Sequence, residues 1–257
     1  MHAKDLFRLE NQVAVVTGGG RGLGRQIAEG LAECGAHVVV CSRKLDACQE
    51  VSEHLKSLGV DSLAFECDVT NPDSMQKVID QTVDHFGRID ILVNNSGATW
   101  GAPVEEMPLE AWQKVFNVNV TGTFLMSQMA GKVMLEQGSG KIINIASVAG
   151  MKGSDPKFMD TIGYNSSKGA VLTFTKDLAV KWGPRGIRVN AIAPGFFPTK
   201  MSKVLMDKGE EAFLQSTPLR KFGGEDDLKG AVIFLSSKAS DHITGDVIVV
   251  DGGTHAM

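Results

Sequence analysis

The chain is poor in the residues that build disulfide frameworks and metal sites. Its 257 residues include four cysteines and six histidines, and the histidines lie far apart without ligand spacing. The cysteines are Cys34, Cys41, Cys48 and Cys67, and no two of them form a C-x-x-C pair. Scattered cysteines of this kind suit small buried side chains in a reducing compartment. We therefore predict no disulfide framework and no protein-bound metal.

An excess of positive charge and long apolar runs are also missing. The formal net charge is −4 and the sequence pI is about 5.9, which argues against nucleic acid or an anionic membrane as a partner. No run approaches the length of a membrane span, and residues 1–8 lack the apolar core of a secretory signal. A cytoplasmic location is therefore the expectation.

Tyrosine is the scarcest aromatic residue, and the single one lies in the stretch 164–168, Tyr-Asn-Ser-Ser-Lys. On a helix, positions i and i+4 share a face, so the Tyr164 hydroxyl and the Lys168 ammonium can point into one cleft. A nearby positive charge can lower the pKa of a phenol by about 1–3 units from its usual value of about 10. Tyr164 would then exchange a proton near neutral pH. The alternative is a helix with an ordinary tyrosine and a solvated lysine.

Short apolar runs alternate with helical patterns along the whole chain. We predict strands at residues 13–17, 37–41, 63–65, 91–93, 142–146, 187–192 and 247–250. Helical patterns cover residues 23–31, 45–58, 72–86, 109–136, about 164–182 and 226–236. Continuous apolar strands joined by helices are typical of a parallel sheet covered on both faces. Because no linker divides the chain, we predict one doubly wound α/β (Rossmann) domain over residues 1–257 with about seven strands.

A glycine-rich turn follows the first predicted strand, with the spacing Gly18-x-x-x-Gly22-x-Gly24. This spacing differs from the usual G-x-G-x-x-G fingerprint but serves the same purpose. Glycine lets the backbone approach a pyrophosphate, and the N–H groups at the start of the following helix can bind it. A tight turn without a ligand is the alternative, but the position in a βαβ unit favours a dinucleotide site.

Basic residues follow the second strand, where NAD-binding proteins commonly carry an acid for the ribose 2′-hydroxyl. Arg43 can grip a 2′-phosphate through its fork of N–H donors, and Ser42 can donate a further hydrogen bond. Arg21 in the glycine turn lies on the same side of the βαβ unit. We therefore predict a preference for NADP(H), with NAD(H) as the weaker cofactor. The alternative is that Arg43 and Lys44 are solvated loop charges.

Polar residues also stand at the carboxyl ends of other predicted strands, where ligands bind in doubly wound sheets. They are Thr17, Asp68, Asn94, Ser147 and the pair Pro194-Gly195. We expect these residues to form one rim of the site.

Together these patterns resemble the short-chain dehydrogenase/reductase family, and the resemblance runs through essentially the whole chain. Its motifs are residues 17–24, Asn94-Asn95-Ser96-Gly97, Asn119, Ser147, Tyr164-x-x-x-Lys168 and Pro194-Gly195 with Thr199. One departure is Ser96, where the family usually has alanine. The resemblance implies that the catalytic residues are Asn119, Ser147, Tyr164 and Lys168. Cofactor contacts are expected at Gly18, Arg21, Gly22, Leu23, Gly24, Ser42, Arg43, Asp68, Val69, Asn94, Gly97, Tyr164, Lys168, Pro194, Gly195 and Thr199.

The chemistry of these residues supports the catalytic assignment. Hydride transfer between a nicotinamide and a carbonyl needs a proton donor for the developing alkoxide, which Tyr164 can supply. Lys168 would hold the nicotinamide ribose, and Ser147 can polarise the substrate oxygen through a hydrogen bond. Asn119 can position a water that links Lys168 to solvent. The alternatives are a helix-distorting role for Asn119 and a capping or loop role for Ser147.

Two segments are expected around the substrate. Residues 151–160 lengthen the loop between Ser147 and Tyr164 beyond what is usual for the family, and residues 196–216 resemble a lid with an apolar inner face. The methionines and phenylalanines of these segments suit either packing or substrate selection.

The substrate class stays open between two branches of the family. Residues 6–9 and 192–201 resemble the gluconate 5-dehydrogenase branch, which implies a keto sugar acid or polyol and is the branch we favour. The general pattern is equally similar to 3-oxoacyl carrier-protein reductases, which implies an acyl thioester. A non-catalytic NADP(H)-binding protein is a further alternative, which the complete Asn-Ser-Tyr-Lys set disfavours. Residues 245–253 resemble the last strand of the family, which implies a homotetramer.

Overall fold

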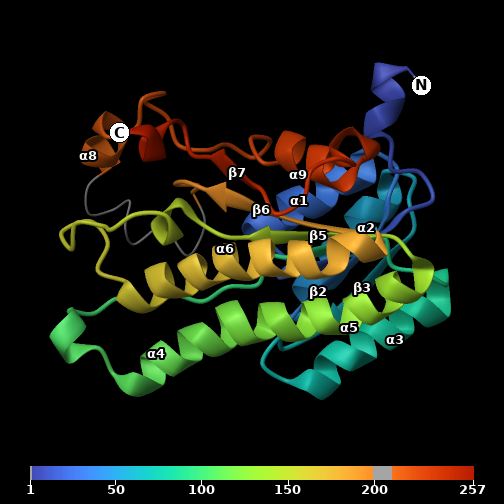
Figure 1. Ribbon diagram of the computed structural model, residues 1–257, viewed down its shortest axis with the longest axis horizontal. Helices are drawn as coiled ribbons and strands as arrows, with labels where there is room; N and C mark the ends of the chain where they lie inside the picture. The colour runs from blue at the N-terminus through green and yellow to red at the C-terminus, as the bar shows by residue number, and fades with distance from the viewer. Residues whose placement is uncertain (1, 199–209) are drawn as a thin grey trace.

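One seven-stranded sheet organises the part of the chain that the computed structural model describes, residues 2–198 and 210–257 (Figure 1). The strand order is β3-β2-β1-β4-β5-β6-β7, and all neighbouring strands are parallel. The strands are β1 (Val13–Thr17), β2 (His37–Ser42), β3 (Ser62–Glu66), β4 (Ile91–Asn94), β5 (Gly140–Ile145), β6 (Ile187–Pro194) and β7 (Val247–Val250). The predicted doubly wound parallel sheet is confirmed.

Helices cover both faces of this sheet. They are α1 (Gly22–Glu33), α2 (Leu45–Ser57), α3 (Pro72–Phe86), α4 (Leu109–Phe116), α5 (Gly122–Gln137), α6 (Ile162–Trp182), α8 (Glu210–Gln215) and α9 (Lys229–Ser236). Short 3-10 segments lie at Ala3–Phe7, Val104–Glu106, Val148–Gly150, Gly183–Arg185, Lys238–Ser240 and Thr254–Ala256. Figure 1 shows α1 and α9 on one side of the sheet and α3, α5 and α6 on the other.

The direction of the side chains explains why both faces must be covered. Ala14 and Val16 of β1 pack into the core that α1, α2 and α9 complete, whereas Val15 packs into the core that α3, α5 and α6 complete. All five residues of β1 are buried. Because successive side chains of a strand point to opposite faces, an uninterrupted apolar run indicates a strand buried on both sides.

Local signals set both ends of α3. The Asn71 side-chain oxygen accepts hydrogen bonds from the backbone N–H groups of Asp73 (3.0 Å) and Ser74 (3.3 Å). Pro72 occupies the first helical position, where its missing N–H is not needed. Gly87 ends the helix with φ of 74°, a left-handed conformation that glycine adopts without strain. The helix is therefore bounded by residues close in sequence.

The predicted helical region over 109–136 is present but is not one regular α-helix. A π-helical turn, Asn117–Thr121, separates α4 from α5. Asn119 lies within this turn and is almost fully buried, and its side chain is bonded to the loop after β4, as described below. Such π turns occur often at functional sites. The predicted helix over 226–236 begins three residues later than expected, at Lys229.

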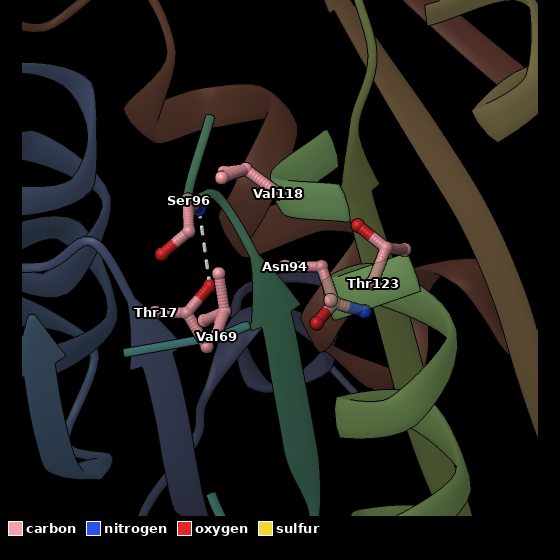
Figure 2. A pocket seen from close by; sticks show the side chains of 7 residues that line it. Thr17, Val69, Asn94, Ser96, Val118 and Thr123 are labelled. Carbon is pink, nitrogen blue, oxygen red and sulfur yellow. Dashed lines mark hydrogen bonds between the residues drawn. The ribbon is translucent and has the colours of Figure 1, made fainter. Parts of the chain in front are cut away.

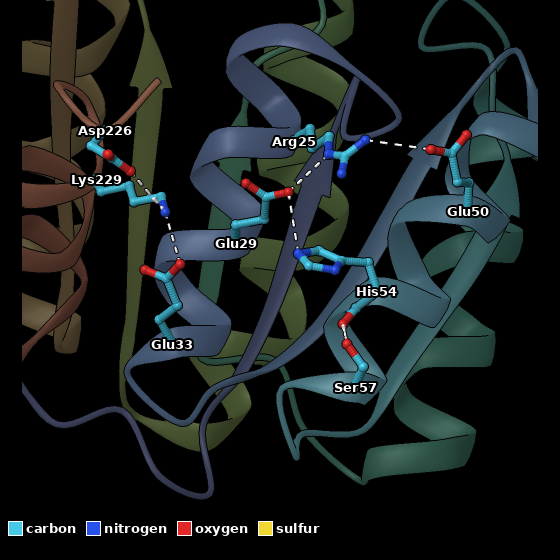
Figure 3. Close-up of polar contacts among 8 residues, drawn as sticks. All are labelled: Arg25, Glu29, Glu33, Glu50, His54, Ser57, Asp226 and Lys229. Atoms are coloured by element: carbon cyan, nitrogen blue, oxygen red, sulfur yellow. Dashed lines mark hydrogen bonds and ion pairs between the residues drawn. The ribbon is translucent and has the colours of Figure 1, made fainter. Parts of the chain in front are cut away.

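Ion pairs on the outside of the first helical layer connect α1 to its neighbours (Figure 3). The Glu29 carboxylate lies 2.8 Å from the Arg25 guanidinium and 3.5 Å from His54 of α2. The Lys229 ammonium of α9 lies 2.7 Å from Glu33. Single surface pairs contribute little to stability, typically below about 1 kcal/mol. These pairs link α2 and α9 to α1, the helix that begins at the glycine turn.

The strand order reverses between β1 and β4, because the chain builds outward from β1 to β3 and then crosses to the other side. In such sheets the crevice at the carboxyl ends beside this switch point binds ligands. Figure 1 shows the segment between β5 and α6 at the same end of the molecule as α8. Within the described ranges, no helix combines the length and the apolar character that a bilayer span requires.

Candidate active site

The glycine turn folds back closely over the start of α1. Gly18 has φ of 66° and Gly22 has φ of 53°, values that favour glycine. A Cβ atom placed on Gly24 would lie 2.2 Å from the Gly18 carbonyl oxygen. The backbone N–H of Gly18 donates to the Cys41 carbonyl of β2 at 2.7 Å. The turn therefore presents backbone free of Cβ atoms at a helix N-terminus, which fits the pyrophosphate of a dinucleotide.

Predicted adenosine contacts lie at the ends of β2 and β3. Ser42 Oγ accepts a hydrogen bond from the Lys44 N–H and lies 3.1 Å from the Cys48 sulfur, while the Arg43 side chain is exposed. Asp68 accepts hydrogen bonds from the Thr70 N–H (2.9 Å) and hydroxyl (2.8 Å). Burial would raise the pKa of Asp68, but the Thr70 hydrogen bonds and the Arg43 charge outweigh burial and lower it. Asp68 is therefore ionised at neutral pH, and Arg43 lies near enough to influence it.

Arg21 and Leu23 flank the glycines of the turn. Arg21 is exposed in extended backbone just before α1, and Leu23 is half-buried in the first turn of the helix. Both therefore lie at the rim where the cofactor contacts are predicted.

A small hollow lies at the carboxyl ends of β1 and β4, beside the switch point (Figure 2). Its lining residues are Thr17, Val69, Asn94, Ser96, Val118, Gly122 and Thr123. The Thr17 hydroxyl oxygen accepts from the N–H groups of Asn95 (3.0 Å) and Ser96 (3.1 Å). These bonds hold the loop after β4 against the end of β1.

The Asn94 amide is occupied inside the protein. Its nitrogen donates to the Ser127 hydroxyl of α5 and to the Asn144 side-chain oxygen of β5, both at 2.9 Å. The Asn144 amide nitrogen in turn donates to the Thr175 hydroxyl of α6 at 2.9 Å. Asn94 is 4% exposed. The side chain thus supports the sheet, and its cofactor contact stays a prediction.

Tyr164 and Lys168 lie on one face of α6, next to Ser147 at the end of β5. The Tyr164 hydroxyl is hydrogen-bonded to the Ser147 side chain. The Lys168 ammonium lies 5.7 Å from the centre of the Tyr164 ring and donates to the Ile145 carbonyl at 2.6 Å. Ser147 Oγ also accepts from the Ala149 N–H at 3.2 Å, so Ser147 caps the 3-10 segment Val148–Gly150 as well. The predicted i and i+4 arrangement is confirmed.

The predicted direction of the Tyr164 pKa is wrong for this structure. Burial raises the pKa of Tyr164 above its ordinary value, and only the Ser147 hydrogen bond acts against it. Burial also lowers the pKa of Lys168 to about 8. The ammonium is directed to the Ile145 carbonyl and lies over the face of the ring, and it therefore gives the hydroxyl no lowering of its pKa. Tyr164 is a neutral phenol at pH 7, the form that donates a proton.

Asn119 connects the loop after β4 to α6. Its side-chain oxygen accepts from the Ala98 N–H (2.7 Å), and its amide nitrogen donates to the Ala98 carbonyl (2.9 Å). The same nitrogen donates to the Ser167 hydroxyl at 2.8 Å, which itself donates to the Tyr164 carbonyl at 2.7 Å. Asn119 therefore lies in the π-helical turn and is linked through Ser167 to the backbone of Tyr164. A Cβ on Gly97 would lie 3.6 Å from the Asn119 side-chain oxygen and 3.9 Å from the Lys168 ammonium.

Ser167 was not singled out from the sequence. It is fully buried and joins Asn119 to the backbone of Tyr164. Its position three residues after Tyr164 places it near the same turn of helix, but a serine at that position carries no signal by itself. Only the contact with Asn119, 48 residues away in sequence, reveals its part in the site.

Pro194 and Gly195 end β6 at the same rim. The Gly195 N–H donates to the Val250 carbonyl at 2.9 Å. A Cβ on Gly195 would lie 2.6 Å from the Asp251 Cβ, so the segment after β7 leaves no room for a side chain at this position. Thr199, and residues 199–209 of the expected lid, lie outside the described residues.

No cluster of three metal-ligating side chains occurs in the described parts of the chain. Cys41, Cys48 and Cys67 are buried and Cys34 is half-buried, all as free thiols.

The chain is similar over nearly its whole length to known reductases and dehydrogenases. The family model described as enoyl-(acyl carrier protein) reductase matches residues 18–255. A 3-oxoacyl-[acyl-carrier-protein] reductase from Synechocystis sp. is 40% identical over 247 residues, covering 95% of this chain and 97% of the relative. A 2-dehydro-3-deoxy-D-gluconate 5-dehydrogenase from Bacillus subtilis is 38% identical over 251 residues, covering 97% and 96%.

Solved structures match equally well. A short-chain type dehydrogenase/reductase from Mycobacterium marinum is 38% identical with a TM-score of 0.95, over 98% of this chain and 99% of that one. A gluconate 5-dehydrogenase from Burkholderia cenocepacia, solved in complex with NADP and tartrate, is 35% identical with a TM-score of 0.94 over 100% of both chains. The likeness therefore includes every element that contributes to the site.

Proposed function

Because the chain belongs to the short-chain dehydrogenase/reductase family, we propose that it is an NADP(H)-dependent enzyme that interconverts a keto sugar acid or polyol ketone with its secondary alcohol. It is an oxidoreductase of the kind that acts on CH–OH groups with a nicotinamide cofactor. The observation that carries the proposal is the hydrogen bond between Tyr164 and Ser147 with the buried Lys168 beside them.

The roles of these side chains follow from their contacts. The cofactor, when bound, supplies or accepts the hydride. Tyr164 donates a proton to the substrate oxygen in reduction, since its raised pKa keeps it protonated at pH 7. In oxidation the same group would act as the base, for which it must first lose its proton. Ser147 hydrogen-bonds the same oxygen and polarises the carbonyl. Lys168 would hold the nicotinamide ribose, and Asn119 would keep the Tyr164 turn in place through Ser167.

The preference for NADP(H) over NAD(H) rests on the end of β2. Arg43 is exposed there, beside a carboxylate, Asp68, that is turned toward Thr70. No acidic residue occupies positions 42–44, where NAD-binding proteins commonly carry one for the ribose 2′-hydroxyl. The Burkholderia cenocepacia relative was solved with NADP, which agrees with the preference. The other cofactor contacts named in the sequence are proposed because the chain shares the family's motifs at these positions.

Gluconate dehydrogenases support the sugar-acid substrate. The structure from Burkholderia cenocepacia covers this chain completely, and a gluconate 5-dehydrogenase from Gluconobacter oxydans is 36% identical over 255 residues. A 3-oxoacyl thioester is the second candidate. It is favoured by the apolar surface around Phe213, whose ring contacts those of Phe158 and Phe196. A homotetramer is proposed from the half-buried last strand β7, whose outer edge has no neighbouring strand among the described residues.

The test is the oxidation of NADPH followed by absorbance, with 5-ketogluconate, other keto sugars and short 3-oxoacyl thioesters as substrates. Turnover of keto sugars alone would support the first candidate, and turnover of thioesters alone would replace it with the second. NADPH binding without turnover of any ketone would leave the non-catalytic alternative. Tyr164→Phe serves as the inactive control.

A further inference from the structure

A buried carboxylate closes the turn that follows β7. The Asp251 side chain is only 3% exposed and accepts hydrogen bonds from the backbone N–H groups of Gly253 (2.8 Å) and His255 (2.7 Å). The Nδ1 atom of the His255 ring lies 2.9 Å from the same carboxylate, and Nδ1 is the donor because a carboxylate can only accept. We call residues 251–255 the post-β7 turn.

The post-β7 turn lies against the end of β6. A Cβ on Gly195 would lie 2.6 Å from the Asp251 Cβ and 2.7 Å from its Cα, and the Gly195 N–H donates to the Val250 carbonyl at 2.9 Å. The Thr254 hydroxyl donates to the Thr217 hydroxyl at 3.4 Å, just after α8. The turn therefore touches both the rim of the site and the segment that follows α8.

The same turn holds the start of the segment 151–160. The Thr254 carbonyl accepts a hydrogen bond from the Lys152 ammonium at 2.7 Å. Lys152 comes shortly after the 3-10 segment that Ser147 caps. A hydrogen bond from a charged donor is among the stronger ones. The turn is thus linked to a segment that begins beside Ser147.

The segment 151–160 also lies against the helix that carries Tyr164. A Cβ on Gly150, just before the segment, would lie 2.5 Å from the backbone of α6. The Ser154 hydroxyl accepts from the Asn165 amide at 3.0 Å, and Asn165 directly follows Tyr164 in α6. A displacement of the segment would therefore change the surroundings of the proton donor.

A chain of contacts thus runs from the His255 ring to the segment 151–160. The ring donates to Asp251, and the carboxylate keeps the post-β7 turn closed. The closed turn in turn presents the Thr254 carbonyl to Lys152.

We propose that His255 is a positioning residue that holds the segment 151–160 in place beside Ser147 and Tyr164. It acts through the post-β7 turn and leaves the proton transfer to Tyr164. Its effect on substrate binding rests on the proposed carbonyl chemistry, whereas its effect on the segment does not. The two effects are therefore measured separately.

Amide hydrogen exchange followed by mass spectrometry tests the position of the segment without any substrate. The N–H groups of Phe158 and Met159 donate to the Asp155 carbonyl at 3.0 and 2.9 Å, so the segment contains amides with measurable protection. In His255→Ala these amides should exchange about threefold to tenfold faster, the factor expected when local opening loses one hydrogen bond. His255→Asn keeps a donor near the Nδ1 position and should restore most of the protection.

His255→Ala is the suitable variant because the histidine side chain is 38% exposed and the Asp251 carboxylate keeps its two backbone donors. The fold should therefore survive the substitution. His242→Ala is the matched control, since His242 is also exposed but lies before β7, at the amino ends of the strands. It should leave exchange in 151–160 unchanged. Unchanged exchange in His255→Ala, or an equal rise in both variants, would overturn the inference.

Kinetics with the ketone that the enzyme reduces provides the second measurement. His255→Ala should raise KM about threefold to tenfold, while kcat and the Kd of NADPH change by less than about twofold. A role in stability alone would lower the thermal midpoint and leave KM unchanged, and that result would overturn the inference.

A double-mutant cycle with Lys152→Met tests the route of the effect. Lys152→Met removes the bond to Thr254 directly, so adding His255→Ala to it should raise KM little further. Effects of the two substitutions that simply multiply would overturn the proposed route. If no ketone is reduced, the proposed function is overturned, and faster exchange in His255→Ala alone would still support the position assigned to His255.

Discussion

On the β1–β3 side of the sheet the site is mostly backbone, whereas on the β4–β6 side it is made of buried polar side chains. The glycine turn leaves no room for a Cβ at Gly24, and the charged Arg43 beside it is exposed. On the other side, Asn119, Ser167 and Lys168 are buried and each is hydrogen-bonded. Substitutions on the first side should therefore act on folding or on cofactor choice, and those on the second side on chemistry.

The largest effect is expected from Tyr164→Phe on the side-chain half. Removing the hydroxyl removes the proton donor, and general acid catalysis of this kind contributes about 10²–10⁴-fold to the rate. The kcat should fall by about that factor in the NADPH assay. NADPH affinity, measured by fluorescence titration, and the thermal midpoint should stay close to wild type. An active Phe variant would break the proposed distinction between the two halves.

Gly24→Ala tests the backbone half through stability. The new Cβ would lie 2.2 Å from the Gly18 oxygen and 2.5 Å from the Asn95 amide, and such overpacking costs about 1–3 kcal/mol or more. The free energy of unfolding in urea should fall by that amount. Gly230→Ala in α9 is the control, because nothing lies within 4 Å of its Cβ. It should stabilise the protein by up to about 1 kcal/mol. Equal effects at both positions would argue against a closely packed turn.

Arg43→Gln sharpens the comparison within the cofactor half. Loss of one charge-assisted contact to a 2′-phosphate should reduce the ratio of kcat/KM for NADPH to that for NADH about tenfold, or about 1.4 kcal/mol. The value for NADH should hardly change. Arg185→Gln provides the control, because Arg185 is exposed before β6, at the amino ends of the strands. An unchanged ratio in Arg43→Gln would indicate that Arg43 is only a solvated loop charge.

The smallest effect is a shift in the titration of the single tyrosine, which ultraviolet absorbance can follow without interference from others. In the cofactor-free protein its midpoint should lie above 10, since burial raises the pKa of Tyr164. Ser147→Ala should raise it further, because the one hydrogen bond that lowers the pKa is lost. A midpoint below 10 would contradict the structure and restore the expectation of a lysine-lowered phenol.

The raised pKa of Tyr164 also makes the stability of the protein depend on pH. Above pH 10 the unfolded chain loses the tyrosine proton while the folded protein keeps it, so the folded state binds more protons. Stability from this group is present below the unfolded pKa and is lost as the pH rises through the folded pKa. In Tyr164→Phe this part of the pH dependence should be missing from urea titrations between neutral and alkaline pH.

The parts of the fold and the site that depend on patterns among residues close in sequence could be predicted. The strands were placed within a few residues because their apolar runs are continuous, and the glycine turn was recognised from spacing within seven residues. The shared face of Tyr164 and Lys168 follows from helix periodicity alone. Ser167 and the π turn were missed, because both depend on the contact between Asn119 and a helix almost fifty residues later.

The parallel sheet, the glycine turn at its switch point and the shared face of Tyr164 and Lys168 are all encoded locally, since each depends on short-range patterns along the chain. The tertiary structure decided the charge state of Tyr164, the internal use of the Asn94 amide and the meeting of Phe158 with Phe213. A pKa depends on burial and on neighbours brought from elsewhere in the chain. Contacts between distant segments likewise exist only once the sheet and its helices have packed.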